Sequence, residues 1–347
     1  MPILPRTPRA LSLLPVLAVV ALSACEDTEV PRVWRTVFAE QPGAFFSVHG
    51  KSASDIWLAG AMHPGTPAAG PTVLHYDGKS WQKPVIAAPG VDLWWAHATQ
   101  NSVWFAGSKG TIVRHQRAAA SWQVQQAPST DHLFGIFAFS DQDVWAVGGP
   151  ADCKKGAPCG VIWHFDGAAW GPAPLLAAEL RGKATWFKVW GRNPSNMFVV
   201  GSEGHLLHFD GKTWTERPSG TTRTLFTVHG NQHLVVAVGG FGTGTLVEDT
   251  GKGFVDVTPK NLPQMNGVYV PEVGVPVAVG LNGEIWQRTA AGWQRDTSAS
   301  DEWRDHHAVF VDPAGDTWAV GGQVFVPPFT EGQLVHRSAK AVAGKLP

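Results

Sequence analysis

The chain has 347 residues, with 27 Lys and Arg against 28 Asp and Glu, for a formal net charge of -1. This balance excludes the basic surface that nucleic-acid binding requires, so we expect no nucleic-acid partner. Its 39 glycines and 26 prolines are scattered as turn punctuation rather than gathered into a linker, which favours one domain although the length allows two.

An export signal opens the chain. Arg6 and Arg9 form a basic start, residues 10–21 are apolar but too short to span a bilayer, and Leu-Ser-Ala-Cys follows at 22–25. This resembles the lipobox of bacterial lipoproteins, in which the cysteine is lipidated and becomes the first residue. The resemblance implies a signal peptide over 1–24, a diacylated Cys25 and a lipid tether over 25–32. The alternative is an ordinary signal peptide with an incidental cysteine.

A repeated unit fills most of the chain after the tether. Each copy holds an apolar run ending in Ala-Gly or Val-Gly, a strand similar to Leu-His-Phe-Asp-Gly, and a lone aromatic residue. The glycines return at intervals of 38 to 53 residues, at Gly60, Gly107, Gly148, Gly201, Gly239, Gly280 and Gly321. Such a period in a strand-like sequence predicts a β-propeller.

The first copy is the most complete. It predicts strands at 45–50, 55–60, 72–76 and 80–82, with a tight hairpin at Asp77-Gly78. The run at 55–60 is apolar without alternation, which is typical of a strand buried on both faces, as stacked blades require.

The outer strands indicate how the ring closes. Six of the seven glycines are each followed by an outer-strand aromatic residue, namely Trp81, Trp122, Trp170, Trp214, Phe254 or Trp293. No seventh follows the strand that ends at residue 337, but Trp34 stands before the first copy. The sequence therefore predicts an all-β, seven-bladed β-propeller over 33–338, closed by the N-terminal strand, with a C-terminal tail over 339–347.

These units resemble kelch and Asp-box (BNR-type) repeats, and the repeat of bacterial lipoproteins with a Gly-x-x-x-x-Asp-Val-Trp-Ala-Val-Gly core. The resemblance covers residues 33–338. The Asp-box has one more residue between its Asp and Trp than Asp77 to Trp81. The enzymatic Asp-box members therefore say little about this chain.

Two cysteines remain after Cys25. Cys153 and Cys159 lie in a Pro/Gly-rich segment at 149–160, and an exported chain meets an oxidising compartment. We therefore predict a disulfide between them. A metal or redox pair is the weaker alternative, because a zinc site needs about four ligands.

The residues that look chemical mostly belong to the repeat. His49 and His229 share a first-strand position, and one third-strand position recurs as His75, His115, His164, His208 and His336. In a ring, equivalent positions of different blades lie far apart and cannot converge on one metal ion. We therefore interpret these histidines as partners in structural hydrogen bonds rather than as metal ligands. The cluster at 301–307 offers two ligands at most, because neighbouring strand residues point to opposite faces. We expect no metal, no cofactor and no catalytic residue; packing explains both Tyr76 and Tyr269.

Four insertions leave the repeat. Those at 61–71, 149–160 and 322–332 join second to third strands, and that at 171–185 joins two blades, so all four belong to one face of the propeller. On this face we expect partner contacts from His63, Lys154, Lys155, Arg181, Phe325, Phe329 and Glu331.

Together these features predict a monomeric lipoprotein of the bacterial cell envelope, anchored to a membrane through its N-terminal lipid. It would lie on the periplasmic side of the outer membrane or on the cell surface and act as a binding or assembly scaffold for an envelope protein or glycan. The alternative is a glycan-binding lectin, or a glycan-active hydrolase or lyase, that uses the same face. A convergent pair of carboxylates in a central pocket would favour the enzyme.

Overall fold

The computed structural model describes residues 1–3, 30–66, 70–150, 159–299 and 304–346. The chain divides into two units, Met1–Val30 and Pro31–Pro347. The described residues of the first unit lie in no helix or strand, and Cys25 and most of the expected signal peptide lie outside the described residues. Among the described residues, no helix is long and apolar enough to cross a membrane.

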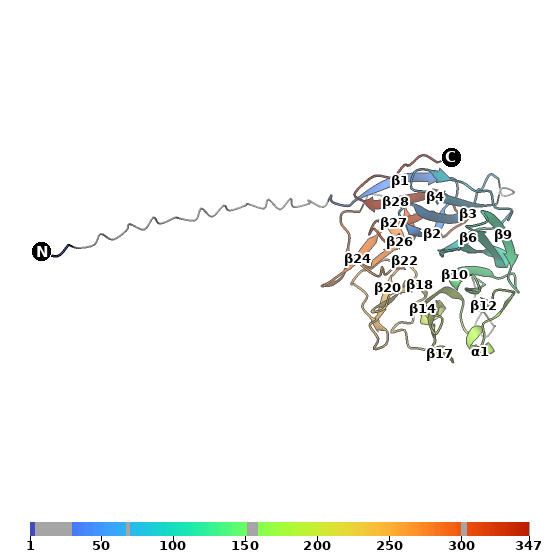
Figure 1. Cartoon of the computed structure of the whole chain (residues 1–347). Coiled ribbons are helices and arrows are strands. Elements are labelled where there is room, and N and C mark those ends of the chain that lie inside the picture. The colour runs from blue at the N-terminus through green and yellow to red at the C-terminus, as the bar shows by residue number, and fades with distance from the viewer. Residues whose placement is uncertain (4–29, 67–69, 151–158, 300–303, 347) are drawn as a thin grey trace. The chain divides into compact units, whose positions relative to one another are not determined.

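The second unit is a ring of seven four-stranded antiparallel sheets (Figure 1). The first strand of each sheet lies nearest the centre, so each sheet is one blade of an all-β, seven-bladed propeller, as predicted. In the order first to fourth strand, the blades are β2 Phe45–Ser52, β3 Asp55–Met62, β4 Pro71–Tyr76, β5 Trp81–Gln82; β6 Leu93–Ala98, β7 Ser102–Gly107, β8 Thr111–Gln116, β9 Ser121–Gln126; β10 His132–Ser140, β11 Asp143–Gly149, β12 Val161–Phe165, β13 Trp170–Pro172; β14 Trp186–Asn193, β15 Asn196–Gly201, β16 Leu206–Phe209, β17 Trp214–Glu216; β18 Leu225–Gly230, β19 Val235–Gly239, β20 Thr245–Asp249, β21 Val255–Asp256; β22 Met265–Tyr269, β23 Val277–Gly280, β24 Ile285–Thr289, β25 Gly292–Arg295; β26 Asp305–Val311, β27 Thr317–Gly322, β28 Gly332–Ser338 and β1 Val33–Gln41.

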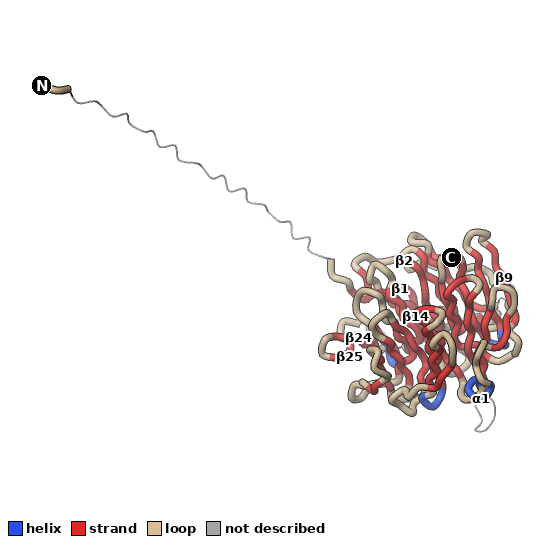
Figure 2. Tube along the Cα trace, turned by 60° about the horizontal axis from the view of Figure 1, so that its bottom comes forward, coloured by secondary structure: helices blue, strands red, loops and turns tan. Residues whose placement is uncertain are grey.

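Short helical turns gather at one edge of the ring (Figure 2). This edge carries the connections from second to third strands and from one blade to the next, and we call it the insertion face. The helical turns are η2 Ser108–Gly110, α1 Ala178–Arg181, η3 Ser202–Gly204 and η4 Leu281–Gly283.

The N-terminal strand closes the ring. β1 pairs antiparallel with β28, with Trp34 opposite Arg337, which confirms the predicted closure. Trp34 is 8% exposed, and its indole N–H donates to the Asp296 carboxylate of blade 6 at 2.9 Å. On the other side, the Trp81 indole N–H donates to the Ala343 carbonyl at 2.8 Å, so the C-terminal tail covers the seam between blades 7 and 1.

The repeated glycine has a steric cause. In every blade the second strand runs against the backbone that enters the first strand, and a Cβ on the glycine would lie 1.8–2.5 Å from a carbonyl oxygen there. At Gly148 the contact is 1.8 Å from the His132 carbonyl, and at Gly321 it is 1.8 Å from the Asp305 carbonyl. Glycine is therefore required at these positions because only a missing side chain permits the close approach.

Outer-strand tryptophans join neighbouring blades. The indole N–H of Trp170 donates to the Gln125 side chain of blade 2 at 2.8 Å, and that of Trp293 donates to Glu248 of blade 5 at 2.6 Å. These side chains therefore hold the blade seams with hydrogen bonds as well as packing.

Two third-strand histidines, His75 and His164, bond within their own blades. The Asp55 carboxylate accepts from the Trp57 indole at 2.8 Å and lies 3.0 Å from His75 Nε2. Blade 3 repeats this network with Asp143, Trp145 and His164. The structural interpretation of these histidines is confirmed there.

Candidate functional site

The first strand of every blade carries an irregularity at the same place. One residue after the partner of the repeated glycine, the register with the second strand shifts, as between Leu133 and Gly135 in β10. A β-bulge of this kind re-aims the side chain of the extra residue. The seven bulged residues are Phe46, Trp94, Phe134, Phe187, Phe226, Asn266 and His307.

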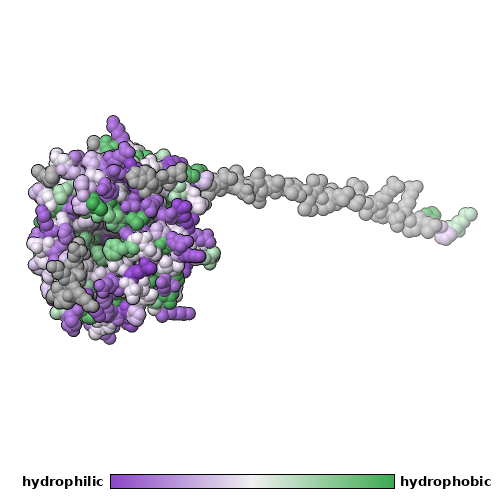
Figure 3. Space-filling model, turned by 180° about the vertical axis from the view of Figure 1, so that it is seen from behind, coloured by the Kyte–Doolittle hydropathy of each residue, from purple (hydrophilic) through white to green (hydrophobic). Residues whose placement is uncertain are grey.

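Six of these side chains line a cavity of about 620 Å³ that opens on the insertion face. Adjacent rings are close, with centroids 5.3 Å apart for Phe134 and Phe187 and 5.4 Å apart for Phe187 and Phe226. Phe46 is fully buried and stacks on Trp94 with centroids 4.2 Å apart. Figure 3 shows this face, with apolar residues gathered around a central hollow.

Loop aromatics extend the wall of this cavity, which we call the aromatic cavity. In the blade 7 insertion, Phe329 packs edge-on against Phe46 and Trp94, and Phe325 lines the cavity while 44% exposed. Phe241, from blade 5, is 69% exposed with its ring centroid 5.0 Å from that of Phe226. The rim therefore offers exposed aromatic surface next to a concave apolar site.

One cation lies in the wall of the aromatic cavity. Lys188 is the residue after the bulge in β14. It is 5% exposed, and its Nζ donates to the Phe134 carbonyl oxygen at 2.7 Å. Its Nζ also lies 3.6 Å from the centroid of the Trp95 ring. No carboxylate pairs with it in the described part of the chain. Burial lowers the pKa of Lys188 well below its usual value.

Some of the other polar groups of the cavity have hydrogen-bond partners within the protein. The Asp92 carboxylate accepts from the Met62 N–H at 2.9 Å, and burial raises its pKa. His307 donates from Nδ1 to the Phe46 carbonyl at 2.5 Å, whereas the buried Trp94 indole N–H has no acceptor among the residues that the structure describes. Asp92 is the single carboxylate among the described lining residues, so they supply no pair for two-carboxylate glycoside chemistry.

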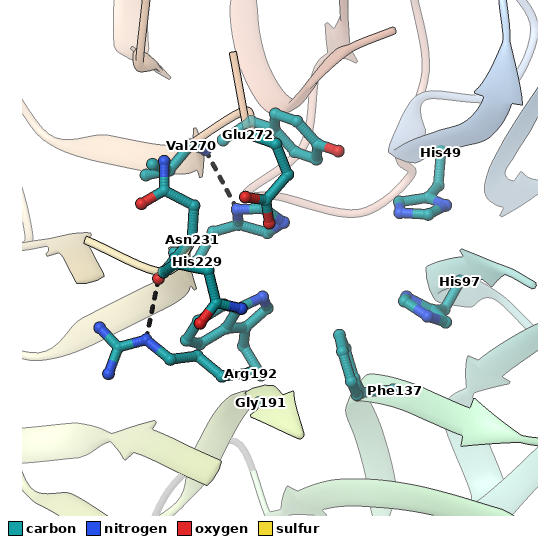
Figure 4. A pocket seen from close by; sticks show the side chains of 13 residues that line it. His49, His97, Phe137, Gly191, Arg192, His229, Asn231, Val270 and Glu272 are labelled. Atoms are coloured by element: carbon teal, nitrogen blue, oxygen red, sulfur yellow. Dashed lines mark hydrogen bonds between the residues drawn. The ribbon is translucent and has the colours of Figure 1, made fainter. Parts of the chain in front are cut away.

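The seven first strands surround a central channel. A second cavity, of about 250 Å³, lies in this channel near the ends of the first strands and the turns that follow them (Figure 4). It shares no described lining residue with the aromatic cavity. A collar of rings occupies the position three residues after each bulge, namely His49, His97, Phe137, Trp190, His229, Tyr269 and Phe310. Nδ1 of His49 accepts from the Ala98 N–H at 3.0 Å, and Nδ1 of His229 accepts from the Val270 N–H at 3.1 Å.

The collar corrects one sequence interpretation. His49, His97 and His229 face one cavity, because first strands surround the axis, so equivalent positions there do converge. Burial lowers the pKa of His97 to about 4 and that of His229 to about 3. Even so, no group of three or more His, Cys, Asp or Glu within the described ranges could hold a metal ion.

The cluster at the start of blade 7 is divided between different surroundings. Asp305 accepts from the Asn282 N–H at 2.9 Å, His306 is 1% exposed, and His307 lines the aromatic cavity. The rest of the cluster, at 301–303, lies outside the described residues.

The remaining candidate residues lie apart from one another. The Glu331 carboxylate accepts from Arg304 Nε at 3.2 Å, His63 lines a separate small cavity, and Arg181 ends α1. Cys159 is 2% exposed. Its predicted partner Cys153, together with Lys154 and Lys155, lies outside the described residues, so the disulfide stays a prediction. Phe325 and Phe329 are the predicted contacts that the structure places on the aromatic cavity.

Comparison with known proteins supports the fold. No family model and no curated protein matches the sequence. Among solved structures, YCF48 from Cyanidioschyzon merolae is similar at 14% identity, with a TM-score of 0.63 over 89% of this chain and 100% of that one. A streptogramin B lyase is similar at 9% identity, with a TM-score of 0.62 over 89% and 98%. The extracellular domain of the BT3049 two-component system from B. thetaiotaomicron, at 11% identity and a TM-score of 0.62, covers 89% of this chain and 42% of that one.

Proposed function

We propose that this propeller is a lipid-anchored binding module of the bacterial cell envelope, and that its ligand places an apolar group in the aromatic cavity. The observation that carries the proposal is the cavity itself, with a volume of about 620 Å³ and walls of bulged aromatic side chains. Ligand sites in proteins have volumes of about 300–1,000 Å³ and combine apolar walls with a few polar groups.

Two further features support this role. The lipobox-like segment before Cys25 suits a protein held at a membrane. The structural neighbour YCF48 is known with a bound D1 peptide, and other neighbours are extracellular domains. The glycan-active alternative lacks support from the described cavity residues, which include one carboxylate, Asp92.

A neutral fluorescent probe tests the proposal. N-phenyl-1-naphthylamine brightens in apolar surroundings, and we expect it to bind the protein with one strong site. Phe226→Gln places an amide in the cavity wall and is expected to weaken binding at least tenfold, because the amide loses its hydrogen bonds to water.

Phe254→Gln is the matched control. Phe254 is a partly buried phenylalanine of the same blade that does not line the aromatic cavity, so this variant should keep full probe binding. Absent probe binding, or equal weakening by the two variants, would show that the cavity is not the site.

A further inference from the structure

Among the described residues that line the aromatic cavity is one lysine, Lys188, and the described structure supplies no counter-ion for it. Lys188 is 5% exposed, and a carbonyl oxygen and an aromatic face are its partners in the described structure. An ammonium group has three N–H donors, so two remain after the bond to the Phe134 carbonyl. A buried cation that lacks a carboxylate partner is costly and is uncommon unless it has a role.

The low polarity of the cavity wall favours an anion as the partner of this side chain. Trp94, Phe134 and Phe187 are among the aromatic side chains that line the same cavity. In the surrounding apolar cavity a charge-assisted bond from ammonium to carboxylate is stronger than one between neutral groups.

We infer that the aromatic cavity accepts an apolar group that ends in a carboxylate, with Lys188 as the counter-ion. This inference rests on the proposed binding function and names the chemistry of the ligand. A small apolar acid and the C-terminal residue of an apolar peptide share that chemistry.

Proton linkage gives this site a distinctive signature. Burial lowers the pKa of Lys188 in the empty cavity and a bound carboxylate raises it again, so any change in the protonation of Lys188 on binding is an uptake of protons. Among the described residues that line the cavity, Asp92, His132 and His307 also carry titratable side chains. The Lys188→Met variant isolates the contribution of the lysine.

Displacement of N-phenyl-1-naphthylamine by matched acids and amides tests the inference. One pair is 3-phenylpropionate and 3-phenylpropionamide, and the other is the peptide Ala-Ala-Phe with a free or an amidated C-terminus. In at least one pair the acid should displace the probe about 10- to 100-fold more effectively than the amide, with proton uptake measured by calorimetry in two buffers. The pair that shows the preference identifies the source of the carboxylate.

Two lysine variants complete the test. Lys188→Met should bind acid and amide equally and lose its share of the proton uptake. Lys183→Met, at an exposed lysine that pairs with Glu216, should keep the preference. Equal displacement by acid and amide in both pairs, no displacement in either pair while the probe binds, or a preference retained in Lys188→Met overturns the inference but leaves the proposed function standing. Absence of probe binding overturns the proposed function itself.

Discussion

Histidines around the channel are held neutral by burial. The pKa of His97 falls to about 4 and that of His229 to about 3, in both cases chiefly because the ring is removed from water. For His229 the Val270 N–H also occupies Nδ1, so protonation there would break a bond between blades. We therefore expect these groups to make the ring sensitive to acid.

The sign of this dependence follows from linkage. Each histidine has a lower pKa in the folded than in the unfolded chain, where it is about 6.5, so acid protonates the unfolded chain first. The contribution of these neutral histidines to the free energy of unfolding is fully present above about pH 6.5. It falls as the pH drops toward 4. For His97 alone the loss between pH 7 and pH 5 is about 2 kcal/mol.

His97→Phe tests this dependence. Phe137 and Phe310 hold the same collar position in other blades, so a phenylalanine side chain fits this position of the propeller. Denaturant melts at pH 7 and pH 5 should show a loss smaller by about 2 kcal/mol in the variant. His233→Phe, at an exposed histidine, is the control and should melt like the parent chain. If His97→Phe and the parent chain lose the same stability, His97 is not the acid-sensitive group.

At the scale of strands, closure depends on a segment far from its partners in sequence. β1 completes the sheet of blade 7, and the Trp34 indole spans to Asp296 of blade 6. Trp34→Ala removes a buried aromatic and should lower the free energy of unfolding by about 3 to 5 kcal/mol. Chemical denaturation followed by tryptophan fluorescence measures the change.

A truncated chain provides the companion measurement. A protein that begins at residue 45 lacks β1 and leaves the edge of β28 unpaired. It should unfold at lower temperature and less cooperatively than one that begins at residue 26. Identical melting of the two chains would contradict a closing role for β1.

The blade 3 insertion carries the predicted disulfide between Cys153 and Cys159. Such a bridge closes a small loop and should contribute at most about 2 kcal/mol, so the fold should survive reduction. The exported protein should show no reactive thiol before reduction and two afterwards, by mass-spectrometric alkylation. Two thiols labelled without reductant would rule the bridge out.

The strands could be predicted because their causes are local. Gly148 must approach the His132 carbonyl, and the count of outer-strand aromatics identifies Trp34 as the missing member. The aromatic cavity could not be assembled in this way, because its bulged residues include Asn266 and His307 as well as phenylalanines. Their common direction depends on a register shift against the second strand, which a single sequence does not display. The sequence does contain one signal of this cavity, which is an aromatic residue that recurs just after the start of the first strand in several blades.

For the whole molecule, the entry of the chain into β1 relates the predicted lipid anchor to the proposed binding site. Arg32 donates from Nη2 to the Ala314 carbonyl at 2.6 Å and from Nε to Asp316 at 2.9 Å, both in the turn between the first two strands of blade 7. The chain therefore enters the propeller on the face that carries the turns between first and second strands, which we call the short-turn face. It lies opposite the insertion face, which holds the aromatic cavity. The predicted tether, residues 25–32, can extend at most about 29 Å.

From this we predict that the lipidated protein turns its short-turn face, with Asp77-Gly78 and Asp210-Gly211, toward the membrane and its aromatic cavity away from it. Limited proteolysis on vesicles should then cleave the insertions at 150–160 and 322–332 while the Asp-Gly turns stay protected. Cys25→Ser, which cannot be lipidated, is the control and should be cleaved alike with and without vesicles. Cleavage confined to the Asp-Gly turns on vesicles would reverse the orientation. The cavity would then face the bilayer, and the source of an apolar carboxylate would be sought among lipids.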